Sequence, residues 1–152
     1  MNLLFDTDKP IGLASDHAGF EIKNHIIDIL KEQNVKYIDY GTFSLDSTDY
    51  PDYAHKLGNA IDNGDCDYGI AVCGSGNGIN ISLNRHRAVR SALCWNVEIA
   101  RLARAHNNAN VLALPGRFIS KQEASDIFTT FFNTEFEGGK HQRRIDKINI
   151  RS

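Results

Sequence analysis

The feature that most restricts the fold is an apolar run that ends in a cysteine and is followed at once by closely spaced glycines. The run covers residues 68–73, and the glycines are Gly74, Gly76 and Gly78. A continuous apolar run of this length is typical of a central strand that is buried on both faces. The segment therefore predicts a strand, a tight glycine turn and a helix over residues 79–86, whose N-terminal N–H groups lie beside the end of the strand.

Strands and helices alternate along the rest of the chain. Short apolar runs predict further strands over residues 10–15, 36–41, 90–94 and 109–114. Helical spacing of apolar residues, or a proline at a favourable N-terminal position, predicts helices after residue 15 and over residues 51–63, 97–106, 121–133 and 142–150. Alternation of this kind indicates a parallel sheet with helices on both faces. We expect one α/β domain over residues 1–152, a Rossmann-like three-layer α/β/α sandwich with a five-stranded parallel sheet and a C-terminal helix.

Composition limits the partners that such a domain could have. A net charge of -2 argues against broad binding to nucleic acid or to anionic membranes. No apolar stretch reaches the length of a membrane span, and the apolar start, residues 1–5, is too short for a signal peptide. The three cysteines are an odd number without an export signal, which indicates reduced thiols. We therefore expect a cytoplasmic protein.

Cys73 is the cysteine best placed for chemistry. At a strand end beside a helix N-terminus, its thiol pKa would be lowered, and the thiolate could act as a base or nucleophile. The alternative is that Cys73 packs as a small hydrophobic residue; the local pattern leaves the two interpretations balanced. Cys66 and Cys94 are interpreted as structural, and no Cys/His pair has the spacing of a zinc site, so no metal is expected.

Polar candidates fall at both edges of the predicted sheet. Asp16 and His17 follow the first strand and Cys73 follows the third, so all three converge on the carboxyl edge, where α/β sheets bind ligands. His106 ends a helix and precedes the fifth strand, which places it at the opposite edge. One chain should not bring His106 to Cys73. If both serve one site, that site must be shared between two chains.

Each polar candidate also has a plain structural interpretation. Asp16 could cap the first helix, while His17 is better suited to gripping a phosphate. His106 and Asn107 could be an exposed helix end. Such local patterns do not separate the two possibilities.

A basic cluster near the C-terminal end could bind phosphate. Lys140 and Arg144 fall on one helical face, although a solvated charged surface explains them equally well. Dinucleotide and ATP sites are improbable, because the glycine spacing departs from the Rossmann fingerprint and no Gly-Lys-Ser/Thr loop is present. His25, His55 and His86 are expected at the surface without a role.

Five motifs in a fixed order give the chain a family resemblance. They are SDHAGF (15–20), DYP (49–51), CGSGNG (73–78), AHNNANVL (105–112) and EGGKHQRR (137–144). With them the chain closely resembles the type B ribose-5-phosphate isomerases, relatives of the galactose-6-phosphate isomerase subunits, from Ile11 to about Ile148. The resemblance implies an aldose–ketose isomerase without cofactor or metal that interconverts ribose 5-phosphate and ribulose 5-phosphate. It also implies a homodimer, often paired into a tetramer, with active sites at the subunit interface.

The resemblance also assigns roles to individual positions. Cys73 matches the catalytic base, in place of a glutamate that other members carry where this chain has Ile79. Ser75 matches the anion hole, and His106 with Asp16 matches the ring-opening group. Positions that match substrate contacts are His17, Tyr50, Gly74, Gly76, Asn77, Gly78, Asn107, Arg117, Lys140 and Arg144. Lys140 departs from the family pattern, because many relatives have an arginine there and an ammonium cannot form a two-pronged contact with phosphate.

Two alternatives remain at this point. Isomerisation of a six-carbon sugar phosphate, such as galactose 6-phosphate or allose 6-phosphate, depends on pocket depth, which the sequence does not reveal. A non-catalytic sugar-phosphate sensor could use the same scaffold. Retention of Cys73, Ser75 and His106 argues against a sensor, since a sensor needs neither a base nor a ring opener.

Overall fold

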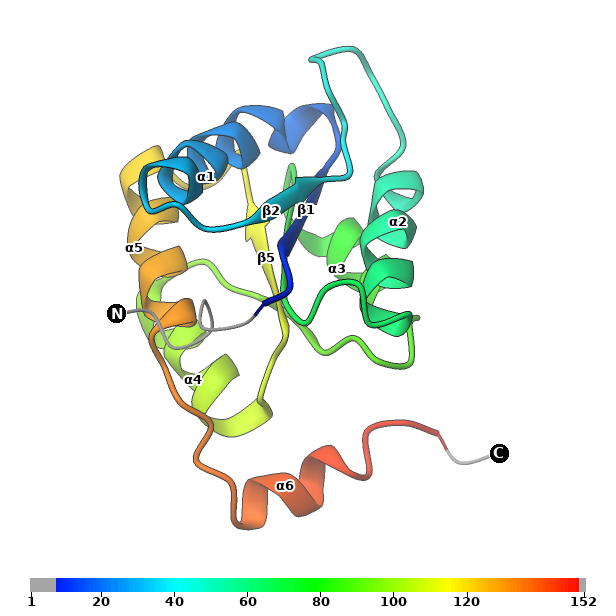
Figure 1. Cartoon of the computed structure of the whole chain (residues 1–152), viewed down its shortest axis with the longest axis vertical. Helices are drawn as coiled ribbons and strands as arrows, with labels where there is room; N and C mark the ends of the chain where they lie inside the picture. Colours follow the sequence, from blue (N-terminus) through cyan, green and yellow to red (C-terminus); the bar gives the residue numbers. More distant parts are fainter. Residues whose placement is uncertain (1–7, 151–152) are drawn as a thin grey trace.

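The computed structural model describes residues 8–150 and shows a parallel five-stranded sheet between two layers of helices (Figure 1). The strand order is β2-β1-β3-β5-β4, and every neighbouring pair is parallel. The strands are β1 (Ile11–Ser15), β2 (Tyr37–Asp39), β3 (Gly69–Cys73), β4 (Ser91–Leu93) and β5 (Val111–Pro115). The predicted fold class is confirmed. The two edge strands, β2 and β4, are shorter than their apolar runs suggested.

The helices divide between the two faces of the sheet. They are α1 (Phe20–Glu32), α2 (Tyr50–Asp62), α3 (Asn77–Leu83), α4 (Val97–Asn107), α5 (Lys121–Phe132) and α6 (Lys140–Ile145). The helices α1, α4 and α5 cover one face, and α2 and α3 cover the other (Figure 1). Each layer buries its own apolar cluster against the sheet, so the sheet is shielded from water on both sides.

The C-terminal helix departs further from its predicted bounds than α3, which was predicted over residues 79–86 and spans Asn77–Leu83. A helix was predicted over residues 142–150, but α6 begins earlier, at Lys140, and ends at Ile145. None of the six described side chains of α6 is buried, and the helix contacts the body of the chain mainly through His141, whose ring stacks on His106 at the end of α4. A charged segment that packs mainly through one side chain gains little tertiary stabilisation, so a longer helix is not supported there.

Two buried cations brace the connections that carry candidate residues. Lys23 is fully buried and donates to Asp39 Oδ1 (2.6 Å) and to the Thr42 carbonyl (2.5 Å), which ties α1 to the loop after β2. Arg104 lies between the rings of Tyr68 and Phe131 and donates to the Ala109 carbonyl (2.6 Å). Arg104 therefore fixes the turn from α4 into β5, which follows His106.

None of the helices in the part of the chain from residue 8 to residue 150 has the length and apolarity needed to cross a membrane.

Candidate active site

Cys73 ends β3 at the carboxyl edge of the sheet, as predicted. Its side chain is only 4% exposed in the single chain. Burial raises the pKa of the Cys73 thiol, the N–H groups of Ile79, Gly76 and Gly78 lower it, and the negative charge of Asp16 raises it further. Burial outweighs the three N–H groups, so the pKa is raised and the expectation that the helix N-terminus would lower it was wrong.

The glycine turn brings several groups close to the sulfur. Gly76 has a φ of 80°, a conformation that strongly favours glycine, and a Cβ atom at Gly78 would collide with the ring of Tyr50. Ser75 is exposed at the turn, and its Oγ accepts from both the backbone N–H and the side-chain amide of Asn77 (3.3 Å each). Since Oγ is the acceptor in both bonds, the Ser75 hydroxyl keeps its own proton for a ligand.

Asp16 and His17 lie beside this turn, after β1. The Gly19 N–H donates to Asp16 Oδ1 (3.1 Å), so Asp16 caps the short 3₁₀ turn His17–Gly19 that leads into α1, and not α1 itself, whose N-cap is Gly19. His17 and Thr48 are joined twice: the His17 N–H donates to Thr48 Oγ1 (3.2 Å), and the Thr48 N–H donates to His17 Nδ1 (3.1 Å). Because Nδ1 accepts, a neutral His17 ring carries its hydrogen on Nε2, where it can be donated to an anion.

Arg117 joins the same group through the neighbouring strand. In the sheet Cys73 pairs with Pro115 of β5, and the chain then turns back over the glycine loop. The Gly116 N–H donates to the Cys73 carbonyl (2.9 Å), and the Arg117 N–H donates to the Gly74 carbonyl (3.0 Å). The backbone of Arg117 therefore lies beside Cys73, and its exposed guanidinium extends from the same edge.

The remaining candidates lie at the amino edge of the sheet. His106 and Asn107 end α4, and Lys140 and Arg144 stand one turn apart on the exposed α6. Between the two edges runs β5, whose length from Val111 to Pro115 is roughly 13 Å at about 3.3 Å per residue. The candidates thus form two groups, one at each edge of the sheet, that one chain does not bring together.

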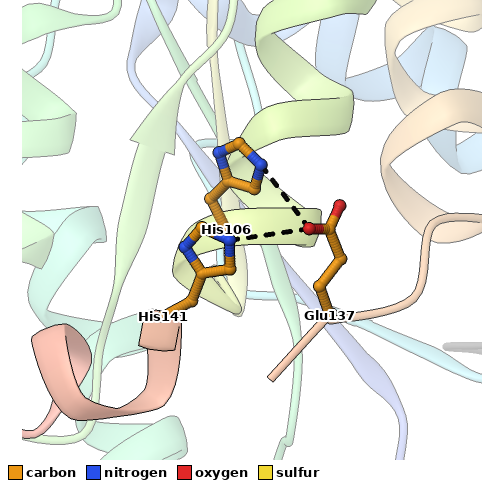
Figure 2. Close-up of side chains that lie close together, drawn as sticks. All are labelled: His106, Glu137 and His141. Carbon is orange, nitrogen blue, oxygen red and sulfur yellow. Dashed lines mark ion pairs between the residues drawn. The ribbon is translucent and has the colours of Figure 1, made fainter. Parts of the chain in front are cut away.

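His106 has two neighbours that were not chosen from the sequence. Its ring stacks on the ring of His141, with centroids 4.2 Å apart and an angle of 13° between the planes. His106 Nε2 lies 3.8 Å and His141 Nε2 lies 3.5 Å from Oε1 of Glu137 (Figure 2). The separation of Glu137 and His141 by four residues in the EGGKHQRR motif was the available signal, although α6 begins only at Lys140.

These three side chains also constitute a possible cation site. One ligand atom from each lies within 4.8 Å of the others, and two imidazoles with a carboxylate are ligands that zinc accepts. The nearly parallel rings, however, direct their nitrogen lone pairs side by side, whereas ligands of one metal must converge on it. The observed arrangement fits contacts of both imidazoles with one carboxylate oxygen better than it fits a metal centre.

The prediction for His86 was wrong. Its Nδ1 lies 2.9 Å from Asp62 Oδ2, its Nε2 lies 2.8 Å from His55 Nδ1, and its side chain is 11% exposed. The ring packs so closely on α2 that a Cβ atom at Gly58 would collide with it. His86 therefore joins α2 to the loop after α3, a long-range contact that no local pattern could reveal.

Known proteins that are similar in sequence and in fold belong to the family that the five motifs resemble. A sequence model described as Ribose/Galactose Isomerase matches residues 11–148. The chain is 39% identical over 140 residues to ribose-5-phosphate isomerase B of Escherichia coli. The match covers 92% of this chain and 94% of the relative. Its fold matches a ribose 5-phosphate isomerase structure from Thermotoga maritima with a TM-score of 0.90 and 48% identity, over 93% of this chain and 98% of that one.

A further relative was solved with a sugar phosphate. Ribose-5-phosphate isomerase B of Mycoplasma genitalium, with bound ribulose 5-phosphate, matches with a TM-score of 0.89 and 41% identity. The match covers 93% of this chain and 95% of that structure.

Proposed function

The chain belongs to the ribose/galactose isomerase family, and we propose that it interconverts ribose 5-phosphate and ribulose 5-phosphate at a site divided between two subunits. One observation carries the proposal: a buried Cys73, with three backbone N–H groups around its sulfur, shares the carboxyl edge with Asp16 and His17. An imidazole and a cationic helix, the other groups that the reaction needs, lie at the opposite edge of the same chain.

Proton transfer is assigned to Cys73. Its thiolate removes the C2 proton of the open-chain aldehyde and returns it at C1, through an enediolate in which the hydroxyl proton of O2 passes to O1, so that C2 becomes the ketone. The N–H groups of Gly76, Gly78 and Ile79 stabilise the thiolate. The negative charge that develops on O1 is met by the Ser75 hydroxyl, and a donor of this kind contributes roughly 3 kcal/mol in comparable sites.

Ring opening and phosphate binding are assigned to both subunits. His106 of the second subunit moves a proton from the anomeric hydroxyl to the ring oxygen. The phosphate lies between His17 Nε2 and Arg117 of one subunit and the face of α6 that carries Lys140 and Arg144 in the other. Tyr50 lines the site against the glycine turn, and Asn107 contacts the sugar from the second subunit. No cofactor or metal has a step in this scheme.

The homodimer is supported by surfaces that a single chain leaves uncovered. None of the described side chains of α6 is buried, and Ile81 on α3 and Ile148 after α6 are 59% and 55% exposed. A hollow of about 410 Å³ separates α6 from the body of the chain and is lined by charged groups that include Arg87 and Arg90. A second subunit that fills these spaces would bring its own Cys73 edge to His106. Pairing of dimers into a tetramer, and a cytoplasmic location suggested by three free cysteines, complete the proposal.

A coupled assay of the purified protein tests the proposed activity. We expect turnover of ribose 5-phosphate with the highest kcat/KM, and lower values for allose 6-phosphate and galactose 6-phosphate. A preference for a six-carbon substrate would replace the pentose assignment while retaining the chemistry. Tight binding of these sugars without turnover of any would instead identify a sensor.

A further inference from the structure

The carboxylate of Glu137 is shared by two stacked imidazoles. The Nε2 atoms of His106 and His141 both approach the same oxygen, Oε1, at 3.8 and 3.5 Å (Figure 2). Glu137 comes from the segment between α5 and α6, His106 from the end of α4 and His141 from α6. Three separate parts of the chain therefore bring their side chains together at one carboxylate oxygen.

The backbone holds this arrangement in place. The Glu137 N–H donates to the Ala105 carbonyl (3.0 Å), which attaches the carboxylate-bearing residue to the helix that carries His106. Arg104 donates from Nε to the Thr134 carbonyl (3.3 Å), which ties the same segment to α4 at a second point. The His141 side chain is only 13% exposed, so its ring is held in place against the ring of His106. The backbone of Glu137 is therefore held against α4, while its side chain, 53% exposed, reaches the two imidazoles from there.

We propose that Glu137 is a positioning residue for His106, with His141 as its stacked support. The inference rests on the ring-opening role proposed above. At 3.8 Å the contact is too long for a hydrogen bond, but the negative charge of the carboxylate favours the tautomer of a neutral His106 that has its hydrogen on Nε2, which leaves the lone pair of Nδ1 for the sugar. Glu137 therefore determines which ring nitrogen of His106 exchanges a proton with the sugar, as a carboxylate does for the histidine of other proton-transfer sites.

The proton balance of ring opening shows why the carboxylate matters. Nδ1 takes the proton of the anomeric hydroxyl, whose bonding electrons form the C1=O bond while the bond between C1 and the ring oxygen breaks. The ring oxygen keeps that electron pair and receives the proton back from Nδ1. Between the two transfers the imidazole is a cation, and the carboxylate 3.8 Å away offsets this charge.

The test separates ring chemistry from enediolate chemistry. Ribose 5-phosphate is a closed furanose, whereas ribulose 5-phosphate is open-chain because its O5 is esterified. Exchange of the C1 hydrogen of ribulose 5-phosphate with D₂O, followed by NMR, needs Cys73 but no ring opening. For Glu137→Gln we expect kcat with ribose 5-phosphate to fall by roughly 10- to 100-fold, with KM within about threefold, while the exchange rate stays within about threefold.

Matched variants decide between positioning and general damage. Glu135→Gln changes an exposed carboxylate two residues away and should leave both reactions unchanged. Adding Glu137→Gln to His106→Ala should cause no further loss, because a residue that acts only through His106 is silent without it. Equal falls in turnover and exchange, wild-type turnover of Glu137→Gln, or an additive double variant would each overturn the proposal.

A second measurement does not depend on activity. In ¹⁵N-labelled protein, the neutral His106 ring should carry its hydrogen on Nε2, and Glu137→Gln should give a mixture of both tautomers. A wild-type His106 ring with its hydrogen on Nδ1 would refute the positioning role. If the wild type shows the Nε2 tautomer but isomerises no sugar phosphate, the proposed function fails and the positioning of His106 stands.

Discussion

Cys73 and His106 lie at opposite edges of one sheet, joined by β3 and β5, whose register pairs Cys73 with Pro115 and Gly69 with Val111. Strand β5 leads from the His106 edge to the Cys73 edge, and its five residues are fully buried. No local rearrangement could bring the two side chains together without dismantling the centre of the sheet. A reaction that uses both residues therefore requires two chains.

Complementation between inactive variants tests the shared site. Cys73→Ala and His106→Ala proteins, unfolded and refolded together, should form mixed dimers in which one site carries both lesions and the other carries neither. With random pairing about half the molecules are mixed, so roughly a quarter of wild-type activity per site should return. Mixed dimers that form, as measured by native mass spectrometry, and yet remain inactive would refute the divided site.

Cys73→Ala should abolish isomerisation without unfolding the protein. The side chain supplies the proposed base, whereas loss of one buried sulfur costs about 1 kcal/mol of stability. Cys66→Ala and Cys94→Ala remove sulfurs that are equally buried, and both should retain most activity. Steady-state kinetics and thermal unfolding of the three variants make the comparison. Near-wild-type turnover of Cys73→Ala would show that another group is the base.

The pH dependence of kcat/KM should report the raised pKa of Cys73. Burial keeps the thiol protonated, so the active thiolate is a minor species at neutral pH, and kcat/KM should rise with pH beyond 9, the ordinary thiol value. Asp16→Asn removes a negative charge that raises this pKa, and the midpoint should move to lower pH whatever happens to the maximal rate. A profile already flat above pH 7 would contradict the thiolate mechanism.

Lys140→Ala and Arg144→Ala should each raise KM by roughly 10- to 100-fold, because a charge-assisted contact contributes about 1.5–3 kcal/mol. The phosphate does not react, so ground and transition states should lose this binding alike and kcat should change little. Lys140→Arg should be tolerated and could tighten binding through a two-pronged contact. A steep fall in kcat at unchanged KM would argue against phosphate binding by α6.

The Asp62–His86 pair should contribute to stability in a pH-dependent way. Burial raises the pKa of Asp62, but the Ala88 N–H and His86 lower it by more, so the folded state favours the carboxylate. Its stabilisation is therefore present above the pKa that Asp62 has in the unfolded chain, and it is lost as pH falls through the lower, folded value.

Asp62→Asn should lower the free energy of unfolding by about 1–2 kcal/mol at pH 7 and by less near pH 3. Urea denaturation at the two pH values measures this, with the exposed Asp28→Asn as the control. An equal loss at both pH values would mean that the charge of Asp62 has no part in the contact.

The sequence by itself determined the succession of strands and helices along the chain, the parallel sheet, and the edge of the sheet at which each candidate lies. Apolar runs and helical spacing are local properties, and parallel connectivity then dictates which residues follow a strand and which precede one. For that reason the sequence alone places Asp16, His17 and Cys73 at one edge and His106 at the other.

Only the tertiary structure decided the environment of each group. The direction of the Cys73 pKa shift depends on how completely distant segments exclude water from the thiol, which no spacing encodes. His86 meets Asp62 and His55, and His106 meets Glu137, across long stretches of chain. The end of α6 at Ile145 likewise reflects how little of that helix is packed against the body of the chain. Desolvation and long-range contacts arise from packing in three dimensions, so they became visible only in the folded chain.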